Sequence, residues 1–366
     1  MTAESKGGHV LSRRRLLALA ALALPAACST SPPAPVPVAA TAVPTVPPIT
    51  FGTPSASPSP SASKSPVAKP TEAPATATRK AEVSSRGGPV PFQAGAAMMG
   101  SYLALGGKSL KQSLALRRRQ LGREQRIVHV FYPWNGYVPR SEPDVAKSST
   151  LMVSWHGAKY AGINNGSSDR NIASVARKLA GMKRPILLRW GWEMNGDWFE
   201  WDGSHNGDNP AGYVSAWRRL HRIFREQGAT NVAWVWSPNW NNAPDSAWNN
   251  FQKYYPGDDY VDWVGVSGYD FYDESPSTLF GAVRKAYGSR KPLILSETAA
   301  VDLGSGSKAA WIRKLSAWVK ATPEVGAVVW FDTDTQQGTD HDFRPDTDAA
   351  ALAAYKAMVN SPRFSG

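Results

Sequence analysis

The 366-residue sequence contains one cysteine, Cys28, and this scarcity excludes two kinds of architecture. A single thiol cannot build a disulfide framework within the chain, and it cannot supply a cysteine-based metal site. The sequence also has no Gly-x-Gly-x-x-Gly fingerprint, no P-loop and no His-Glu-x-x-His motif. We therefore expect a protein that works with no metal and no cofactor.

The N-terminal apolar run, residues 16–27, is too short to cross a bilayer as a helix. It follows Arg13-Arg14-Arg15 and precedes Cys28, an order typical of an export signal. The arginines resemble a twin-arginine signal, and residues 24–28 resemble a lipoprotein processing site. We predict that residues 1–28 direct export, with acylation of Cys28 and ordinary cleavage nearby as alternatives. The protein would then be secreted or lipid-anchored to the outer face of the cytoplasmic membrane.

Aromatic residues are nearly absent from residues 29–89, where 14 of the 29 prolines are mixed with Ala, Ser and Thr. Such a composition cannot bury enough apolar surface to offset the entropy lost on ordering. We predict a disordered linker over this stretch. The remaining residues, 90–366, contain all 15 tryptophans and suit a single catalytic barrel domain.

The excess of positive charge does not by itself indicate a nucleic-acid-binding protein. The formal net charge is +12, but residues 1–89 hold 9 Lys and Arg against 3 Asp and Glu, which leaves 32 against 26 in residues 90–366. Charges of both signs are interspersed there, and Arg117-Arg118-Arg119 is more typical of a solvated helix face than of a phosphate-binding patch. We expect no nucleic-acid partner, and contact with a membrane only through the signal or a lipid anchor.

From residue 90 onward, short apolar runs alternate with stretches of helical period, which predicts βα units and a parallel sheet. The clearest amphipathic stretches are residues 213–224 and 311–319. Eight strands separated by helices over this length predict an α/β fold, a (β/α)₈ TIM barrel, whose chemistry lies at the C-terminal ends of the strands. The predicted strands are Gln93–Met99, Arg126–Phe131, Thr150–Ser154, Pro185–Arg189, Asn231–Trp236, Val261–Val266, Pro292–Ser296 and Gly326–Phe331.

Two glutamates, Glu193 and Glu297, follow apolar strands, whereas other acids such as Glu200 and Asp270 lie in polar loops. Burial of Glu193 among neighbouring indole rings would raise its pKa, which suits a general acid near neutral pH. Two carboxylates on separate strand ends of one barrel are what the cleavage of a glycosidic bond requires. The alternative is that both are loop acids in ion pairs, and we favour the catalytic pair.

Tryptophans gather at or just after the predicted strand ends, where indole rings could stack on sugar rings or could simply pack in the core. His156 follows the third strand and is either a residue of the sugar subsites or a structural histidine. The residues that we expect to contact substrate are Trp134, Trp155, His156, Arg189, Trp192, Trp198, Trp236, Tyr269 and Trp330.

Residues 189–201 resemble the acid/base segment of glycoside hydrolase family 26, and Leu295-Ser-Glu-Thr298 resembles its nucleophile strand. Residues 213–239 and 255–269 resemble further segments of the family, in the same order. The resemblance implies a retaining mechanism with Glu193 as acid/base, Glu297 as nucleophile and Tyr269 hydrogen-bonded near the nucleophile. In the family's mannanases a histidine usually precedes the acid/base, and here Trp192 occupies that place.

The resemblance implies a polysaccharide partner and a monomeric endo-β-1,4-mannanase, with mixed-linkage β-glucan and β-1,3-xylan as alternative substrates. A carbohydrate-binding barrel that no longer hydrolyses is a rival of another class, and so is a structural cell-wall lipoprotein. Both glutamates are retained, and this favours the enzyme.

Overall fold

The computed structural model describes residues 87–334 and 341–364. The predicted export signal, residues 1–28, and residues 29–86 of the predicted linker lie outside the described residues, so both stay predictions. Residues 87–89, which we assigned to the linker, already contact the barrel, since the Trp263 indole N–H donates to the carbonyl oxygen of Gly87 at 3.1 Å. In the part of the chain that the structure describes, no helix has the length and apolarity needed to span a bilayer.

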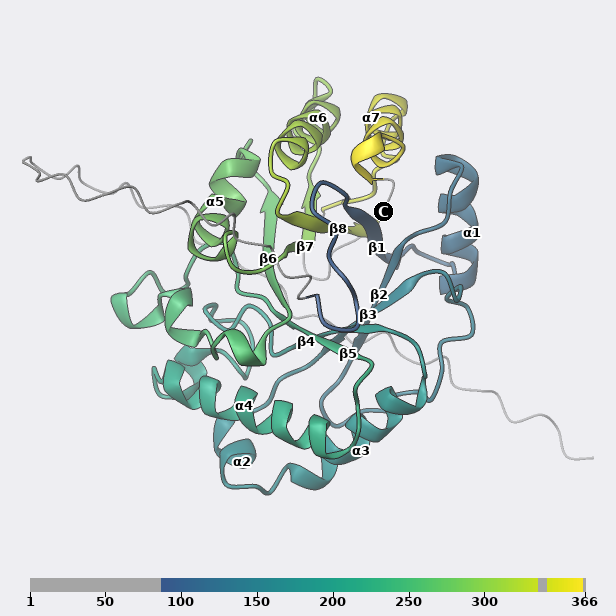
Figure 1. Ribbon diagram of the computed structural model, residues 1–366. Coiled ribbons are helices and arrows are strands. Elements are labelled where there is room, and N and C mark those ends of the chain that lie inside the picture. Colours follow the sequence, from purple (N-terminus) through teal and green to yellow (C-terminus); the bar gives the residue numbers. More distant parts are fainter. Residues whose placement is uncertain (1–86, 335–340, 365–366) are drawn as a thin grey trace, which may run out of the picture. The chain divides into compact units, whose positions relative to one another are not determined.

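Eight parallel strands pair in sequence order, and β8 pairs with β1, so the sheet closes into a barrel (Figure 1). This closed sheet confirms the predicted TIM barrel. The strands are β1 (Met98–Ala104), β2 (Ile127–Tyr132), β3 (Thr150–Trp155), β4 (Ile186–Trp190), β5 (Val232–Trp236), β6 (Trp263–Asp270), β7 (Leu293–Ala300) and β8 (Val325–Thr333).

Helices surround the barrel in Figure 1 and return the chain to the start of the next strand. Two connections differ from the simple alternation that we predicted: residues 133–149 contain no helix, and β5 leads to β6 through three short 3₁₀ helices. The α-helices are α1 (Leu110–Leu121), α2 (Tyr160–Asn164), α3 (Asp169–Gly181), α4 (Pro210–Glu226), α5 (Pro276–Tyr287), α6 (Ser307–Lys320) and α7 (Ala349–Val359). The 3₁₀ helices are η1 (Gly203–Asn206), η2 (Ala247–Asn249), η3 (Phe251–Tyr254), η4 (Asp258–Tyr260) and η5 (Pro362–Phe364).

Local sequence signals account for the ends of several helices. Ser109 caps α1 in a capping box with Gln112, and Gly122 ends the helix with φ +78°, a conformation that glycine adopts without strain. Pro210 begins α4, where a proline needs no hydrogen-bond partner for its nitrogen. The predicted amphipathic stretches fall in α4 and α6, and most of their apolar side chains are buried, with Val214 and Trp318 half-buried.

The core has two parts, and the alternation of side chains along each strand separates them. Met152, Leu187, Trp263, Ile294 and Val329 fill the barrel interior near the strand starts. The residues between them along the strands belong to the larger layer that lies between the strands and the helices. Toward the strand ends, the inward positions are polar or aromatic, and these positions form the site described below.

The first strand begins later than we predicted, at Met98 and not at Gln93. Gly95 takes φ +81°, and the Ala96 N–H donates to the Gln93 carbonyl oxygen at 3.1 Å, so this segment turns before the strand starts. Val90 and Phe92, just before the turn, pack into the lower barrel interior. The apolar run therefore closes the bottom of the barrel and does not extend β1.

Candidate active site

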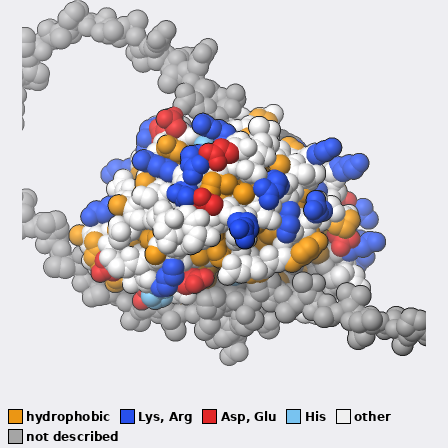
Figure 2. All heavy atoms as spheres, turned by 90° about the horizontal axis from the view of Figure 1, so that it is seen from below, with side chains coloured by type: hydrophobic (Ala, Val, Ile, Leu, Met, Phe, Trp, Pro, Cys, Tyr) orange, Lys and Arg blue, Asp and Glu red, His pale blue; other side chains and the backbone are white. Residues whose placement is uncertain are grey.

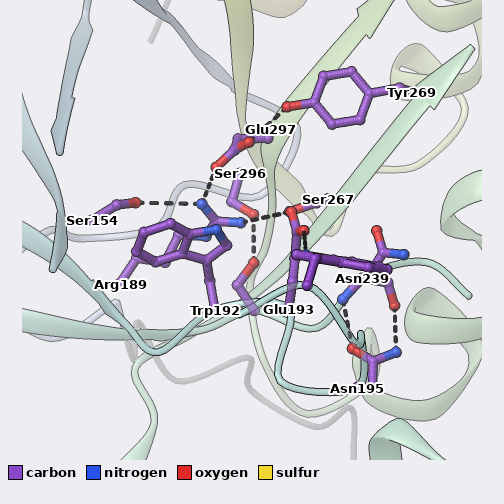
Figure 3. Close-up of polar contacts among 12 residues, drawn as sticks. Ser154, Arg189, Trp192, Glu193, Asn195, Asn239, Ser267, Tyr269, Ser296 and Glu297 are labelled. Atoms are coloured by element: carbon purple, nitrogen blue, oxygen red, sulfur yellow. Dashed lines mark hydrogen bonds and ion pairs between the residues drawn. The ribbon is translucent and has the colours of Figure 1, made fainter. Parts of the chain in front are cut away.

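Arg189 lies at the centre of a polar cluster inside the strand-end half of the barrel (Figure 3). Its guanidinium forms ion pairs with both glutamates: Nη1 contacts Glu297 Oε1, and Nη2 lies 3.5 Å from Glu193 Oε1. The same side chain donates from Nη2 to Ser267 Oγ at 2.5 Å and from Nη1 to Ser154 Oγ at 3.3 Å. The two carboxylates, 104 positions apart in the chain, thus converge on one fully buried guanidinium.

The backbone after β4 turns sharply to present Glu193. Gly191 has φ +50° and Glu193 has φ +55°, and the latter is a left-handed conformation that a glutamate rarely adopts. The Glu193 N–H donates to the Ser237 carbonyl oxygen at 2.8 Å, which anchors the turn to the end of β5. Strained residues of this kind cluster at functional sites, where the surrounding structure maintains them.

The environment of Glu193 suits a proton donor. Burial, and next the negative charge of Glu297, raise the pKa of Glu193 to about 7, although Arg189, Ser267 and Trp198 oppose the shift. The Trp198 indole N–H donates to Glu193 Oε2 at 3.1 Å. The carboxyl group therefore retains its proton up to a pH near neutrality.

Glu297 comes from β7 at an irregularity in the sheet. The pairing of β6 with β7 shifts register between Val266 and Ser267, so that Ser267 lies opposite Glu297. An irregularity of this kind can change the direction of a nearby side chain, and here the Glu297 carboxylate beside it points at Arg189. The Tyr269 hydroxyl donates to Glu297 Oε2 at 2.6 Å, as the family resemblance implied. On β1, burial and the charge of Glu297 raise the pKa of the Tyr102 phenol to about 12.

Serine, histidine and asparagine side chains that the sequence analysis did not identify support this cluster. His129 Nε2 lies 2.7 Å from Ser154 Oγ, which in turn accepts from Arg189. Asn195 bridges the loops after β4 and β5: its Oδ1 accepts from the Asn239 N–H at 2.8 Å, and its Nδ2 donates to the Asn239 carbonyl oxygen at 3.0 Å. The alternation of side chains along each strand could have identified three of them, because His129, Ser154 and Ser267 occupy inward positions of β2, β3 and β6.

Four of the predicted substrate-contacting tryptophans lie on the helix side of the barrel wall, which corrects our expectation that they line the cleft. Trp155, Trp236 and Trp330 are 0% exposed and take outward strand positions. Trp155 stacks on Trp134 at 4.5 Å, Trp236 contacts Tyr255 and Tyr287, and Trp330 contacts Trp311 and Tyr355. Each aromatic ring is used in packing between strands and helices and has no free face for a sugar.

Three further predicted contacts, His156, Trp192 and Trp198, lie on the barrel's inner side. The Arg189 guanidinium lies over the Trp192 ring at 5.1 Å, and the His156 ring lies 5.3 Å from Trp192. Burial lowers the pKa of His156 to about 4, so this histidine is neutral at neutral pH. Trp198 is partly exposed, whereas Trp192 is 2% exposed and covers Arg189. Of these three, Trp198 combines access to solvent with a direct contact to Glu193.

The described residues contain no group of three or more His, Cys, Asp or Glu side chains that could hold a metal ion. The acid-base groups at the centre of the site are its two carboxyl groups, both paired with Arg189. One carboxyl is protonated near neutral pH, and the other is held by an arginine and a tyrosine, at the strand ends of one barrel. This arrangement defines a site of the glycoside hydrolase class.

Sequence comparison identifies the family. The model described as "Glycosyl hydrolase family 26" matches residues 137–321, a stretch that includes Glu193, Glu297 and Arg189. The chain belongs to glycosyl hydrolase family 26, a family of glycoside hydrolases.

Solved structures of this family share the fold. A GH26 β-mannanase from Bacteroides ovatus superposes with a TM-score of 0.57 over 77% of this chain and 92% of that chain, at 17% identity. A modular endo-β-1,4-mannanase from Cellulomonas fimi has a TM-score of 0.53 over 74% of this chain and 72% of that chain, at 19% identity. At such identities the likeness supports the barrel fold alone.

Curated relatives differ in the substrates that their names state. Endoglucanase H of Acetivibrio thermocellus is 31% identical over 258 residues, which cover 66% of this chain and 28% of that protein. Beta-1,3-xylanase TXYA of Vibrio sp is 32% identical over 40% of this chain and 30% of that protein. A mannan endo-1,4-beta-mannosidase of Bacillus subtilis is 30% identical over 39% of each chain. The chain thus spans under two thirds of the length of each of these relatives.

Proposed function

We propose that the protein is a retaining endo-β-glycanase in which Glu193 is the acid/base and Glu297 is the nucleophile. The observation that carries the proposal is the convergence of both carboxylates on Arg189, with a pKa of about 7 for Glu193. We also propose that this enzyme is exported and degrades a polysaccharide outside the cytoplasm, because residues 1–28 are predicted to be an export signal.

The proposed reaction has two steps. Glu297 attacks the anomeric carbon while Glu193 gives its proton to the leaving oxygen, and a covalent glycosyl-enzyme forms. Glu193, now ionised, takes a proton from a water molecule that attacks the anomeric carbon and releases the sugar from Glu297. Arg189 and Tyr269 favour the ionised form of Glu297, because both donate hydrogen bonds to its oxygens.

For the substrate we propose a β-glucan first and β-1,4-mannan second. The match to Endoglucanase H covers 258 residues, whereas the match to the Bacillus subtilis mannanase covers 151. Trp192 supports the same order, since it replaces the polar histidine that mannanases of this family usually carry before the acid/base. β-1,3-Xylan is a third substrate to be tested, on the strength of the xylanase relatives.

Substitution of each glutamate tests the function. We expect Glu297→Ala to lower reducing-sugar release at least about 10³-fold, and Glu193→Ala to lower it roughly 10²- to 10⁴-fold. The assay would use lichenan, carboxymethylcellulose, mannan and β-1,3-xylan. The matched control is Glu200→Ala, an exposed glutamate of the same loop, which should keep full activity. If release from every substrate is unchanged in Glu297→Ala, the hydrolase assignment is wrong.

A further inference from the structure

The charged residues of the barrel are divided between its two ends. At one end, the last seven residues of α1, α3, α4, α5, α6 and α7, with the residues that follow each helix, form what we call the strand-entry face. These segments are residues 115–126, 175–185, 220–231, 281–292, 314–324 and 353–364, and they hold 19 Lys and Arg but only 3 Asp and Glu.

The opposite end has the reverse balance. The described strand-exit loops and the first turns of the helices hold 17 Asp and Glu against 6 Lys and Arg, counted over residues 105–111, 156–174, 191–213, 237–250, 270–279, 297–310, 332–334 and 341–350. Residues 133–149 and 251–262, which connect strands without an α-helix, hold 3 Lys and Arg against 5 Asp and Glu, and Asp258 among them pairs with Arg290 of the strand-entry face. Even with both segments added, the strand-entry face would hold 22 basic against 8 acidic residues. The carboxylates of the active site lie at the acidic end.

Ion pairs neutralise six of these 19 basic residues. The three acids of the segments, Glu124, Glu226 and Glu324, pair with Arg118, Arg222 and Arg284. Arg117, Arg290 and Lys314 pair with acids outside the segments, Arg117 with Asp332 and Asp346, Arg290 with Asp258 and Lys314 with Asp273. Basic residues in a last helical turn are favoured by the helix dipole, which explains one or two for each helix. The connecting segments add more basic residues. Figure 2, which views the flank of the barrel where α3 and α4 lie, shows more Lys and Arg than Asp and Glu there. The strand-entry face thus keeps an excess of positive charge after these ion pairs are counted.

The N-terminal part of the chain joins the barrel at this same face. The Trp263 indole N–H donates to the carbonyl oxygens of Gly87 and Val90, both at 3.1 Å. Residues 89–98 line a small pocket together with Arg126, Thr150 and Gly326, which lie at or beside strand starts. The 86 residues that precede Gly87, including the predicted export signal and Cys28, therefore connect to the basic end and not to the active-site end.

We propose that the strand-entry face docks on an anionic phospholipid surface, so that the active site points away from the membrane. Lys and Arg near an anionic leaflet strengthen membrane binding, and their effect decays over a Debye length of about 8–10 Å. A basic surface is a common membrane-binding signal, used alone or together with a lipid anchor. The docking does not require acylation of Cys28, and it places the acidic active-site end toward a polysaccharide on the far side.

The test measures binding of the full chain, with Cys28→Ser to prevent acylation, to sedimented vesicles. Vesicles of phosphatidylglycerol and phosphatidylcholine are compared with vesicles of phosphatidylcholine alone, at low and at high salt. The docking variant combines Lys285→Gln, Lys320→Gln and Lys356→Gln, three exposed lysines from the last turns of α5, α6 and α7. The control variant makes the same change of charge at the other end, with Lys108→Gln, Lys111→Gln and Arg170→Gln.

We expect salt-sensitive binding to the anionic vesicles, reduced roughly tenfold or more in the docking variant and less than about twofold in the control. Residues 1–28 are themselves basic, but any binding through them is common to all variants, so the difference between the docking variant and the control reports on the strand-entry face. Equal losses in the two variants, or equal binding to both kinds of vesicle, would overturn the proposal. Binding to soluble polyphosphate without binding to anionic vesicles would overturn it too, since the partner would then be an anionic polymer.

Discussion

Arg189 determines how the two carboxylates of the site influence each other. Its charge stabilises the ionised form of both, while burial and the charge of Glu297 oppose ionisation of Glu193. The outcome for Glu193 is a pKa raised to about 7. Two carboxyl groups whose environments differ can serve as acid and nucleophile in one site.

The pKa of Glu193 predicts how activity depends on pH. Glu193 must be protonated for the first step, so kcat/KM should fall as the pH rises through about 7. The Ser267 hydroxyl stabilises the ionised form of Glu193, and Ser267→Ala should therefore raise this pKa further. We expect the alkaline limb of the pH profile to move upward by roughly one unit in this variant.

Ser296→Ala provides the matched control for that measurement. The Ser296 hydroxyl lies 2.7 Å from Ser237 Oγ and is not among the groups that shift the pKa of Glu193. Its alkaline limb should stay where it is in the unmodified protein. A downward shift in Ser267→Ala, or equal shifts in the two variants, would contradict the electrostatic account of Glu193.

The sequence singled out Glu193, Glu297, Arg189 and Tyr269, and the structure brings these four together. Glu193 and Glu297 were visible because they follow apolar strands, whereas Arg189 and Tyr269 came from the family resemblance. The roles of all four stay predictions. Ser154, Ser267 and His129 were missed because a serine or histidine inside an apolar run looks like an ordinary core residue. Only the arrangement of β2, β3, β4 and β6 in the barrel reveals these contacts. Ser154 and Ser267 accept hydrogen bonds from Arg189, and His129 contacts Ser154.

At the scale of the strands, side-chain parity separates chemistry from packing. Arg189 points into the barrel, and its neighbour Trp190 contacts Tyr213 and Trp217 of α4. The prediction that strand-end tryptophans line the cleft was wrong for Trp155, Trp236 and Trp330. It considered where each residue lies along its strand but not whether the side chain points into the barrel or outward. The strand positions themselves were predictable from apolar runs, except at β1, where a turn at Gly95 interrupts the run.

Replacement of an outward tryptophan should change stability and leave the chemistry intact. Trp236 is fully buried against Phe251, Tyr255 and Tyr287, so Trp236→Ala should lower the free energy of unfolding by about 3–5 kcal/mol. Denaturant unfolding measures the loss, and KM should remain the same wherever the variant is folded. Trp198→Phe is the comparison: it removes the donor to Glu193 and should lower kcat with little effect on unfolding. A raised KM together with unchanged stability in Trp236→Ala would instead indicate that Trp236 contacts the substrate.

At the scale of the whole molecule, the barrel separates opposite charges at its two ends. Net charge, the quantity available from composition, shows only a modest excess over residues 90–366 and hides this division. The topology of the barrel reveals it, because each α-helix that leads into a strand ends beside the start of that strand. The same topology gathers the ends of β4 and β7 into one site, which makes Glu193 and Glu297 neighbours.

The stereochemistry of the product tests the central claim most directly. If Glu297 attacks the anomeric carbon and Glu193 then activates water, the configuration at that carbon is inverted twice and so retained. Proton NMR of the first products released from the best β-glycan substrate, recorded before mutarotation, distinguishes the two anomers. The account predicts that the β-anomer appears first, and initial release of the α-anomer would contradict it.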